Sequence, residues 1–259
     1  MKNNIKILGT NGTKGMFGGT TAFQIDKANM IDAGNLVVPL GDSTCDIQKI
    51  WLTHSHLDHI EDIAYILDSY FHCRKQSLRV CGLQETIEAL QKHFLNDIIW
   101  PDFSKIKLPG FDEMALAYEV IIPDKEYAIS ENMTIEAFKT DHIAGSCGYI
   151  IKKDGRSLLI TSDTYSLDSA IAKINSNPTI TALVVECSFP SKMARLAKDS
   201  KHLTPELLFN GIKPVEERGL QLYVNHIKPL CEEVIREEIG VMKGKWEVEI
   251  LKDSEIIYF

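Results

Sequence analysis

Three histidines and an aspartate crowd into the stretch THSHLDHI, residues 53–60. Imidazole nitrogens and carboxylate oxygens are common ligands of divalent transition metals. His54 and His56, two positions apart in an extended turn, can point the same way and bind one ion. Asp58 and His59 can turn toward a second ion. Two ions about 3.5–4 Å apart can stabilise a displacement at phosphorus, but a site for both needs further ligands from elsewhere in the chain.

Several segments that are expected to be strands end at residues that could supply those ligands. The apolar runs in MTIEAFKT, GYIIKKDGRSLLITS, TALVV and LQLYVN are typical of buried strands. Because such strands deliver their carboxyl ends to a common edge of a sheet, the residues that follow should lie close together. These residues are His142, Asp163, Glu186 and His226. Each signal is weak alone: a strand-end histidine often only packs in the core, and Asp163 could equally be the N-cap of a helix.

The histidine cluster is expected on a strand-to-helix turn. QKIWLT, residues 48–53, predicts a buried strand that ends at the cluster. Apolar residues then recur at helical spacing and predict a helix with Asp58 and His59 at its N-terminus. They are Ile60, Ile63, Ala64, Leu67, Tyr70 and Phe71. The earlier runs IKIL, AFQID and NMIDAG indicate hairpin strands, so the chain predicts α/β layers with helices outside. His72 and His93 lie in helical patterns away from the cluster, and structural roles are expected for both.

The composition limits the class of protein. The 259 residues, 44% of them hydrophobic, suffice for a large core, and we predict a single domain over residues 1–259. The chain has 28 Lys and Arg against 36 Asp and Glu, a net charge of −8. This balance argues against a protein that grips long nucleic acid. A small anionic substrate fits better, because a metal ion supplies positive charge locally.

The cysteines and the N-terminus lead to expectations about the compartment. Scattered cysteines with no C-x-x-C pair predict free, mostly buried thiols of a reducing compartment. They are Cys45, Cys73, Cys81, Cys147, Cys187 and Cys231. The N-terminus has no apolar run long enough for a signal peptide, and no segment approaches the roughly 18–20 apolar residues of a membrane span. We therefore expect a soluble, cytoplasmic protein with no membrane partner; a monomer and a homodimer both stay open.

A set of motifs resembles a known family. THSHLDHI is followed, in family order, by DHIAGSCGY, ITSDT, ECSFP, KHLTPELL and NHIKP. The first motif resembles the metallo-β-lactamase superfamily, and the set as a whole resembles its class II cyclic-nucleotide phosphodiesterases. The segments GMFGGTTAFQID and FLNDIIWPDF are also similar to that family. The resemblance implies a metallo-β-lactamase-like αββα sandwich, in which two packed mixed sheets carry outer helices.

The resemblance also implies a set of metal ligands. The first ion would have three histidine ligands, the second an aspartate and two histidines, and a further aspartate would bridge the two. In that order the ligands are His54, His56 and His142; Asp58, His59 and His226; and Asp163. The two ions would be divalent transition metals. Zinc suits the histidine-rich set, and neither manganese nor iron is excluded.

Further residues have implied roles next to the metals. His202, paired with Glu186, resembles the histidine–carboxylate couple of related phosphodiester-cleaving enzymes, and Asp58 joins these two as a catalytic residue. Asp32 would support a metal ligand from behind. The chain departs from the family at Asp62, where the helix usually has glycine.

The implied function is the hydrolysis of 3′,5′-cyclic nucleotides, cAMP, cGMP or both, to nucleoside 5′-monophosphates. A hydroxide held between two metal ions would attack phosphorus, and His202 would protonate the departing 3′ oxygen. A rival function is that of an RNA-processing nuclease of the tRNA 3′-end type. Such enzymes carry an RNA-binding arm between the third and fourth metal motifs, yet His142 and Asp163 are only 21 positions apart. Three more functions stay open: a hydrolase of small esters or lactams, a metal-stabilised binding module and a redox di-iron protein.

Overall fold

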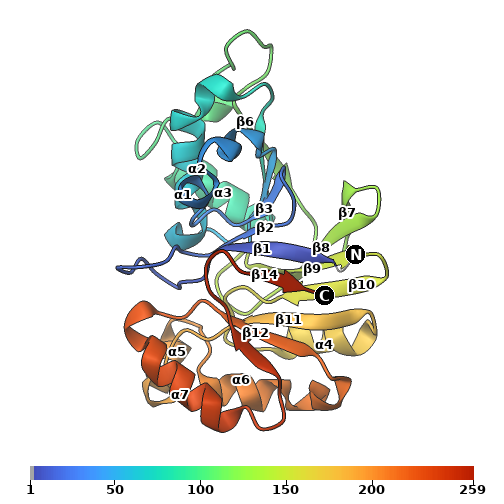
Figure 1. Ribbon diagram of the computed structural model, residues 1–259. Coiled ribbons are helices and arrows are strands. Elements are labelled where there is room, and N and C mark those ends of the chain that lie inside the picture. The colour runs from blue at the N-terminus through green and yellow to red at the C-terminus, as the bar shows by residue number, and fades with distance from the viewer. Residues whose placement is uncertain (1–2) are drawn as a thin grey trace.

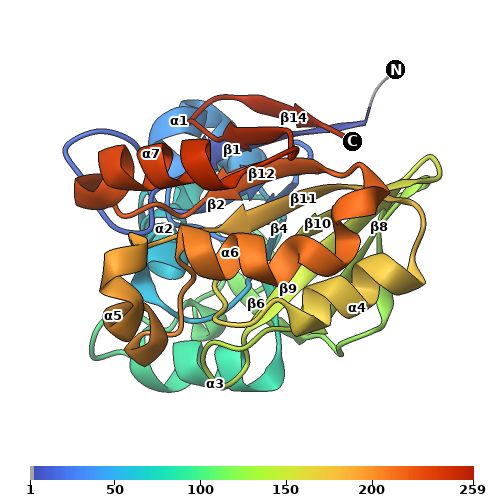
Figure 2. The same cartoon turned by 90° about the horizontal axis from the view of Figure 1, so that it is seen from below.

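The computed structural model describes residues 3–259, and within that range two seven-stranded sheets pack face to face. Helices α1 to α3 cover the outer face of one sheet, and α4 to α7 cover the outer face of the other (Figure 1). Figure 2 shows the second set of helices in front of the strands that they cover. This αββα arrangement confirms the predicted fold.

The first sheet has the strand order β14-β1-β2-β3-β4-β5-β6. Strands β14, β1, β2 and β3 pair antiparallel, whereas β3, β4, β5 and β6 pair parallel, so the sheet is mixed as predicted. The strands are β1 Asn4–Gly9, β2 Ala22–Gln24, β3 Asn29–Ile31, β4 Lys49–Trp51, β5 Leu78–Gly82, β6 Leu116–Val120 and β14 Ile256–Tyr258.

The second sheet has the order β13-β12-β11-β10-β9-β8-β7. Its first four strands in this order are parallel and the others antiparallel. The strands are β7 Glu126–Ser130, β8 Met133–Lys139, β9 Cys147–Lys153, β10 Arg156–Ile160, β11 Ile180–Glu186, β12 Gln221–Asn225 and β13 Val248–Ile250. The carboxyl ends of β10, β11 and β12 therefore lie side by side, as the motif positions predicted.

Helix α2 lies where the apolar periodicity predicts a helix, and a second predicted helix differs from the structure. Within the described residues the α-helices are α1 Val37–Leu40, α2 Leu57–Ser69, α3 Gln84–His93, α4 Asp168–Ser176, α5 Ala194–Asp199, α6 Pro205–Ile212 and α7 Glu232–Met242. The sequence PELLFNGIKPVEERG, residues 205–219, predicts one continuous helix. In the structure α6 ends at Ile212, and a 3-10 helix, Lys213–Arg218, follows. Pro214 explains the break, because proline has no amide hydrogen for the α-helical bond.

Three apolar clusters hold the layers together. The central cluster lies between the sheets and includes Trp51 of β4 and Tyr149 of β9, both fully buried. Along β9, Tyr149 and Ile151 face this cluster, while Ile150 packs with the helices on the other side. Strands that are buried on both faces explain the near-continuous apolar runs in the sequence.

The free-thiol prediction is wrong for two cysteines. Cys45 and Cys73 form a disulfide across 28 positions of sequence, with their Cα atoms 5.9 Å apart. Helix α2 returns the chain to the segment before β4, and this tertiary contact leaves no spacing signal in the sequence. Cys81, Cys147 and Cys187 are free and buried, and Cys231 is free and partly buried. The expected cytoplasmic location rested in part on the cysteines being free thiols, and it stays a prediction.

The start of α2 is held by the residue that departs from the family. The buried carboxylate of Asp62 accepts hydrogen bonds from the backbone amides of Leu36 and Val37, at 2.6 and 2.8 Å. Asp62 therefore ties α2 to the start of α1, a role that glycine cannot have.

No helix within residues 3–259 has the length and apolar character to cross a membrane. The single-domain assignment stays a prediction.

Candidate metal centre

The seven predicted metal ligands gather at one edge of the sandwich, where both sheets contribute. His54 and His56 follow β4, and Asp58 and His59 begin α2. The other three follow β8, β10 and β12, respectively; they are His142, Asp163 and His226. Thus short turns on rigid strands position the side chains, which is typical of functional sites.

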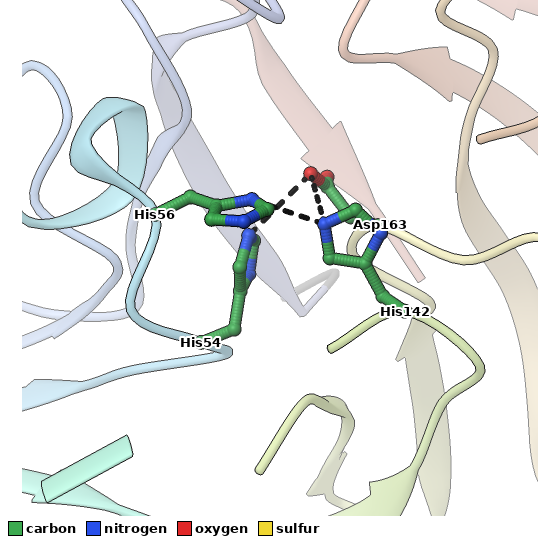
Figure 3. Close-up of side chains that lie close together, drawn as sticks. All are labelled: His54, His56, His142 and Asp163. Atoms are coloured by element: carbon green, nitrogen blue, oxygen red, sulfur yellow. Dashed lines mark hydrogen bonds and ion pairs between the residues drawn. The ribbon is translucent and has the colours of Figure 1, made fainter. Parts of the chain in front are cut away.

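One group of four residues surrounds the Asp163 carboxylate from the side of β4. Donor atoms of His54, His56, His142 and Asp163 all lie within 4.8 Å of one another. Asp163 Oδ2 is 3.5 Å from His54 Nε2 and 3.7 Å from His142 Nε2. His142 Nε2 lies 3.0 Å from His56 Nδ1. Figure 3 shows these four side chains turned toward a common point.

A second group lies on the other side of the same carboxylate. Asp58, His59 and His226 also have donor atoms within 4.8 Å of one another. His226 Nε2 is 3.2 Å from Asp163 Oδ1 and 3.4 Å from Asp58 Oδ2. His59 Nε2 is 3.5 Å from Asp163 Oδ2. Asp163 therefore reaches both groups, as a bridging carboxylate must.

Hydrogen bonds behind the site fix the imidazole rings. Asp32 Oδ2 lies 2.8 Å from His59 Nδ1, and the same carboxylate accepts bonds from the amide and hydroxyl of Thr53. His142 Nδ1 is 2.9 Å from the carbonyl oxygen of Lys201. These contacts orient the remaining ring nitrogens toward the centre, the arrangement found behind metal-binding histidines. Asp32 thus lies where the resemblance places it.

The protonation states suit metal ligation. Burial and neighbouring imidazoles hold the pKa of His54 well below its usual range and lower that of His56 to about 4, so both rings are neutral at pH 7, the form that binds a metal ion. Burial raises the pKa of Asp163, but His226, His59 and His54 together outweigh it and hold the carboxylate ionised. His59 is the exception: burial lowers its pKa, while Asp163 and Asp32 raise it well above its usual range.

Two buried atoms in this cluster have no hydrogen-bond partner among the described residues. They are Nε2 of His54 and Oδ1 of Asp163. Unpaired buried polar atoms are costly, and in addition two imidazole nitrogens, Nε2 of His59 and of His226, face each other at 3.2 Å. Divalent ions would satisfy all of these atoms, so the residues present fit a metal centre.

A buried hydrogen-bond network lies against the second group. His202 Nδ1 is 2.8 Å from Glu186 Oε1, and the other oxygen of Glu186 accepts a bond from Ser188 Oγ at 2.7 Å. Ser188 Oγ is also 2.9 Å from His226 Nδ1, so the network connects His202 to the metal cluster. Sequence reasoning did not single out Ser188, although it stands in ECSFP, two positions after the glutamate that ends the strand.

His202 also has donor atoms near Asp163 and His226, within 4.8 Å. Its Nδ1 is 4.0 Å from Asp163 Oδ2 but 2.8 Å from Glu186. Burial lowers the pKa of His202, whereas Glu186 and Asp163 raise it, and the net shift is upward. A raised pKa favours a proton on the ring, which suits a proton donor better than a ligand. His72 and His93 are exposed and lie in other parts of the fold.

Comparisons with known proteins identify the family of the chain. The family model described as cAMP phosphodiesterases class-II matches residues 31–161, which is 131 of the 259 residues. The 3′,5′-cyclic-nucleotide phosphodiesterase 1 of Saccharomyces cerevisiae is 26% identical over 212 residues, which is 70% of this chain and 56% of that protein. A 3′,5′-cyclic-nucleotide phosphodiesterase of Schizosaccharomyces pombe is 27% identical over 96 residues, covering 37% of this chain and 25% of that protein. The match thus spans little more than half of one curated relative and a quarter of the other.

Solved structures share the fold. Unliganded yeast PDE1 has a TM-score of 0.80 at 20% identity, with all of both chains covered. The metallo-beta-lactamase fold protein YhfI from Bacillus subtilis has a TM-score of 0.75 at 19% identity, with 99% of both chains covered. At this identity the structures show the fold alone, whereas the family model matches the sequence that carries the first metal motif. The chain belongs to the class-II cAMP phosphodiesterase family and has the metallo-β-lactamase fold.

Proposed function

We propose that the chain is a metal-dependent phosphodiesterase that hydrolyses 3′,5′-cyclic nucleotides, cAMP, cGMP or both, to nucleoside 5′-monophosphates. One observation carries this proposal: a carboxylate shared by two ligand groups lies beside a buried histidine–glutamate pair. The first feature suits an anionic diester, and the second can supply the proton that its leaving oxygen needs. Family membership supports the cyclic-nucleotide substrate.

The proposed centre holds two divalent transition-metal ions. The first would be bound by His54, His56 and His142 and the second by Asp58, His59 and His226, with Asp163 shared between them. When bound, such ions neutralise charge on the phosphodiester and lower the pKa of water, so that a nucleophile is present at neutral pH. A set of five imidazoles and two carboxylates suits zinc, and manganese and iron also fit it.

The chain's own contribution to the chemistry is a proton at His202. Because Glu186 occupies Nδ1 of this ring, Nε2 is the nitrogen that can donate to a substrate. Glu186 in turn accepts bonds from the amides of Thr164 and Leu203, at 2.9 and 3.2 Å, so its own position is fixed. We propose that Nε2 of His202 donates its proton to the 3′ oxygen as the bond from this oxygen to phosphorus breaks.

An RNA-processing function is less well supported. The segment between His142 and Asp163 contains only β9, β10 and the tight turn between them at Asp154 and Gly155. Pairing between β9 and β10 begins at Lys153 and Arg156, directly beside the turn. The hairpin therefore has no protruding arm. A net charge of −8 also disfavours a long polyanion.

One set of assays tests the proposal. One metal-loaded preparation is incubated separately with cAMP, cGMP, bis(p-nitrophenyl) phosphate and a precursor tRNA, and the products are identified by chromatography. We expect 5′-monophosphates from the cyclic nucleotides, loss of activity after chelation and recovery on adding zinc or manganese. Processing of precursor tRNA with no cleavage of cyclic nucleotides would replace this function with that of a nuclease.

A further inference from the structure

A cavity of about 680 Å³ lies between the loop that joins β1 to β2 and the segment that follows the proposed ligand His226. Its walls are mainly apolar and also include two lysines, Lys14 and Lys228. They include Met16, Phe17, Phe189, Lys228, Pro229 and Leu230. The volume is in the range of sites that hold drug-sized ligands, roughly 300–1,000 Å³. None of these residues has a role in the mechanism proposed above.

The cavity shares a wall with the catalytic network. The ring centroids of Phe189 and His202 are 5.7 Å apart, and Lys228 Nζ lies 5.9 Å from the centre of the Phe189 ring. On the other side, Gly12 lies directly against His226: a Cβ atom at Gly12 would come within 2.7 Å of His226 Nδ1. Residues that line the cavity, or that adjoin its lining, therefore contact both His202 and His226.

The outer wall is the loop between β1 and β2, which projects as a dark-blue loop in Figure 1. At its tip Met16 and Phe17 are 88% and 82% exposed, an unusual placement for two neighbouring large apolar side chains. The loop is nevertheless anchored. Asn11 Nδ2 donates to the carbonyl oxygen of Phe17 at 2.8 Å, and the Gly19 amide donates to Asp253 at 2.6 Å.

We infer that this cavity, here called the base pocket, binds the purine base of the nucleotide, with Phe17 stacked on the base. The inference deepens the proposed function and rests on it. A cyclic nucleotide is a phosphodiester joined through one sugar to a flat aromatic base, and the site pairs a metal centre with an apolar cavity in the same way. Aromatic side chains stack on any base, because every base has a π-face.

The anchored loop explains why such exposed apolar residues would be useful. Lys228 Nζ donates a hydrogen bond to the carbonyl oxygen of Gly12, which connects the loop to the segment that carries His226. With its backbone held at both ends, the loop presents Phe17 at the rim of the base pocket. A bound base would cover the Phe17 ring, which is otherwise in water.

The test compares the binding of two ligands that share the ribose 5-phosphate group, one with a base and one without. Isothermal titration calorimetry on the metal-loaded protein compares 5′-AMP with ribose 5-phosphate for the unaltered chain, Phe17→Ala and Phe17→Trp. We expect Phe17→Ala to weaken AMP binding about tenfold, within the range for losing one base–aromatic stack, and to leave ribose 5-phosphate unchanged. Phe17→Trp should restore AMP binding, because it keeps an aromatic face. Val241→Ala, which shortens an equally exposed apolar side chain on α7, serves as the matched control.

Three results would overturn the inference. Equal binding of AMP and ribose 5-phosphate to the unaltered chain would mean that the base pocket holds no base. An equal loss for both ligands in Phe17→Ala would mean that the loop shapes the phosphate site instead. If Phe17→Ala changed only the oligomeric state in analytical ultracentrifugation, the loop would be an interface between copies of the chain. Because binding is measured without turnover, failure to hydrolyse cyclic nucleotides would be recognised separately, as failure of the proposed function.

Discussion

Replacing His202 with alanine separates the proposed proton donor from the metal centre. The substitution removes the imidazole that lies 2.8 Å from Glu186. The Glu186 carboxylate would keep its bonds from Ser188 Oγ and from the amides of Thr164 and Leu203, at 2.7, 2.9 and 3.2 Å. Its charge therefore stays solvated by the protein, and we expect His202→Ala to fold and to retain both metal ions.

The expected change is in the rate. Loss of a general acid typically lowers kcat by roughly 10²–10⁴-fold, which corresponds to about 3–5 kcal/mol of transition-state stabilisation. The deficit of His202→Ala with cAMP should fall in this range. With bis(p-nitrophenyl) phosphate it should be much smaller, because p-nitrophenolate leaves without protonation. Glu186→Gln should show the same pattern more weakly, since Glu186 acts through the orientation of His202.

Steady-state kinetics on both substrates, with metal content measured by elemental analysis, decide whether His202 donates a proton. His93→Ala removes an exposed histidine of α3 and should change neither quantity, so it controls for the handling of the variants. Equal rate losses on the two substrates would contradict proton donation and favour substrate binding. Loss of one metal ion from His202→Ala would instead make His202 a ligand.

Three further predictions address the metal centre and the stability of the fold. The protein purified without chelator should contain close to two transition-metal ions per chain, and Asp163→Ala should lose much of this content in elemental analysis; full activity in a metal-free preparation would refute the centre. Cys45→Ser should lower the free energy of unfolding by about 3–4 kcal/mol in urea denaturation, the chain-entropy value for a 28-residue loop, and a reductant should destabilise the unaltered chain but not the variant. Burial raises the pKa of Glu136, but two lysines bonded to it, at 2.5 and 2.6 Å, outweigh burial and lower the pKa. The stabilisation of roughly 1 kcal/mol is therefore complete above the usual pKa of about 4.5 and is lost as the pH falls through the lower folded value. Glu136→Gln should be less stable than the unaltered chain at pH 7, and this difference in stability should shrink as the pH is lowered below 4.5; a deficit that stays constant as the pH falls would contradict this.

Local signals explain what could be predicted from the sequence. The cluster of His54, His56, Asp58 and His59 needs only a strand followed by a helix, and both elements have clear apolar periodicity. The order of the later motifs was enough to predict that strand ends converge, because parallel neighbours align their carboxyl ends. The length of α6 was not predicted correctly, since Pro214 stands within an otherwise continuous helical pattern.

Features that depend on tertiary contact alone were not predicted. The Cys45–Cys73 disulfide forms because α2 returns to the segment before β4, and nothing in the spacing of the two residues signals this. Ser188 connects His202 with His226 only because the ends of β11 and β12 are adjacent. Asp62 was recognised as a departure from the family, but its bonds to two backbone amides become visible only in three dimensions.

The backbone conformation at the site gives a physical reason why its detailed geometry was not predicted from the sequence. Eight non-glycine residues within 3–259 have positive φ, and four of them adjoin the candidate site: Asp32, Ser162, Lys201 and His226. Left-handed backbone costs such residues about 1 kcal/mol or more each, so the surrounding contacts must hold it. Lys201 shows what this conformation achieves, because its carbonyl oxygen accepts a bond from His142 while the next residue places its ring on Glu186. One strained residue thus orients a proposed metal ligand and the proposed proton donor, and the strain lies where the strands end and the chemistry begins.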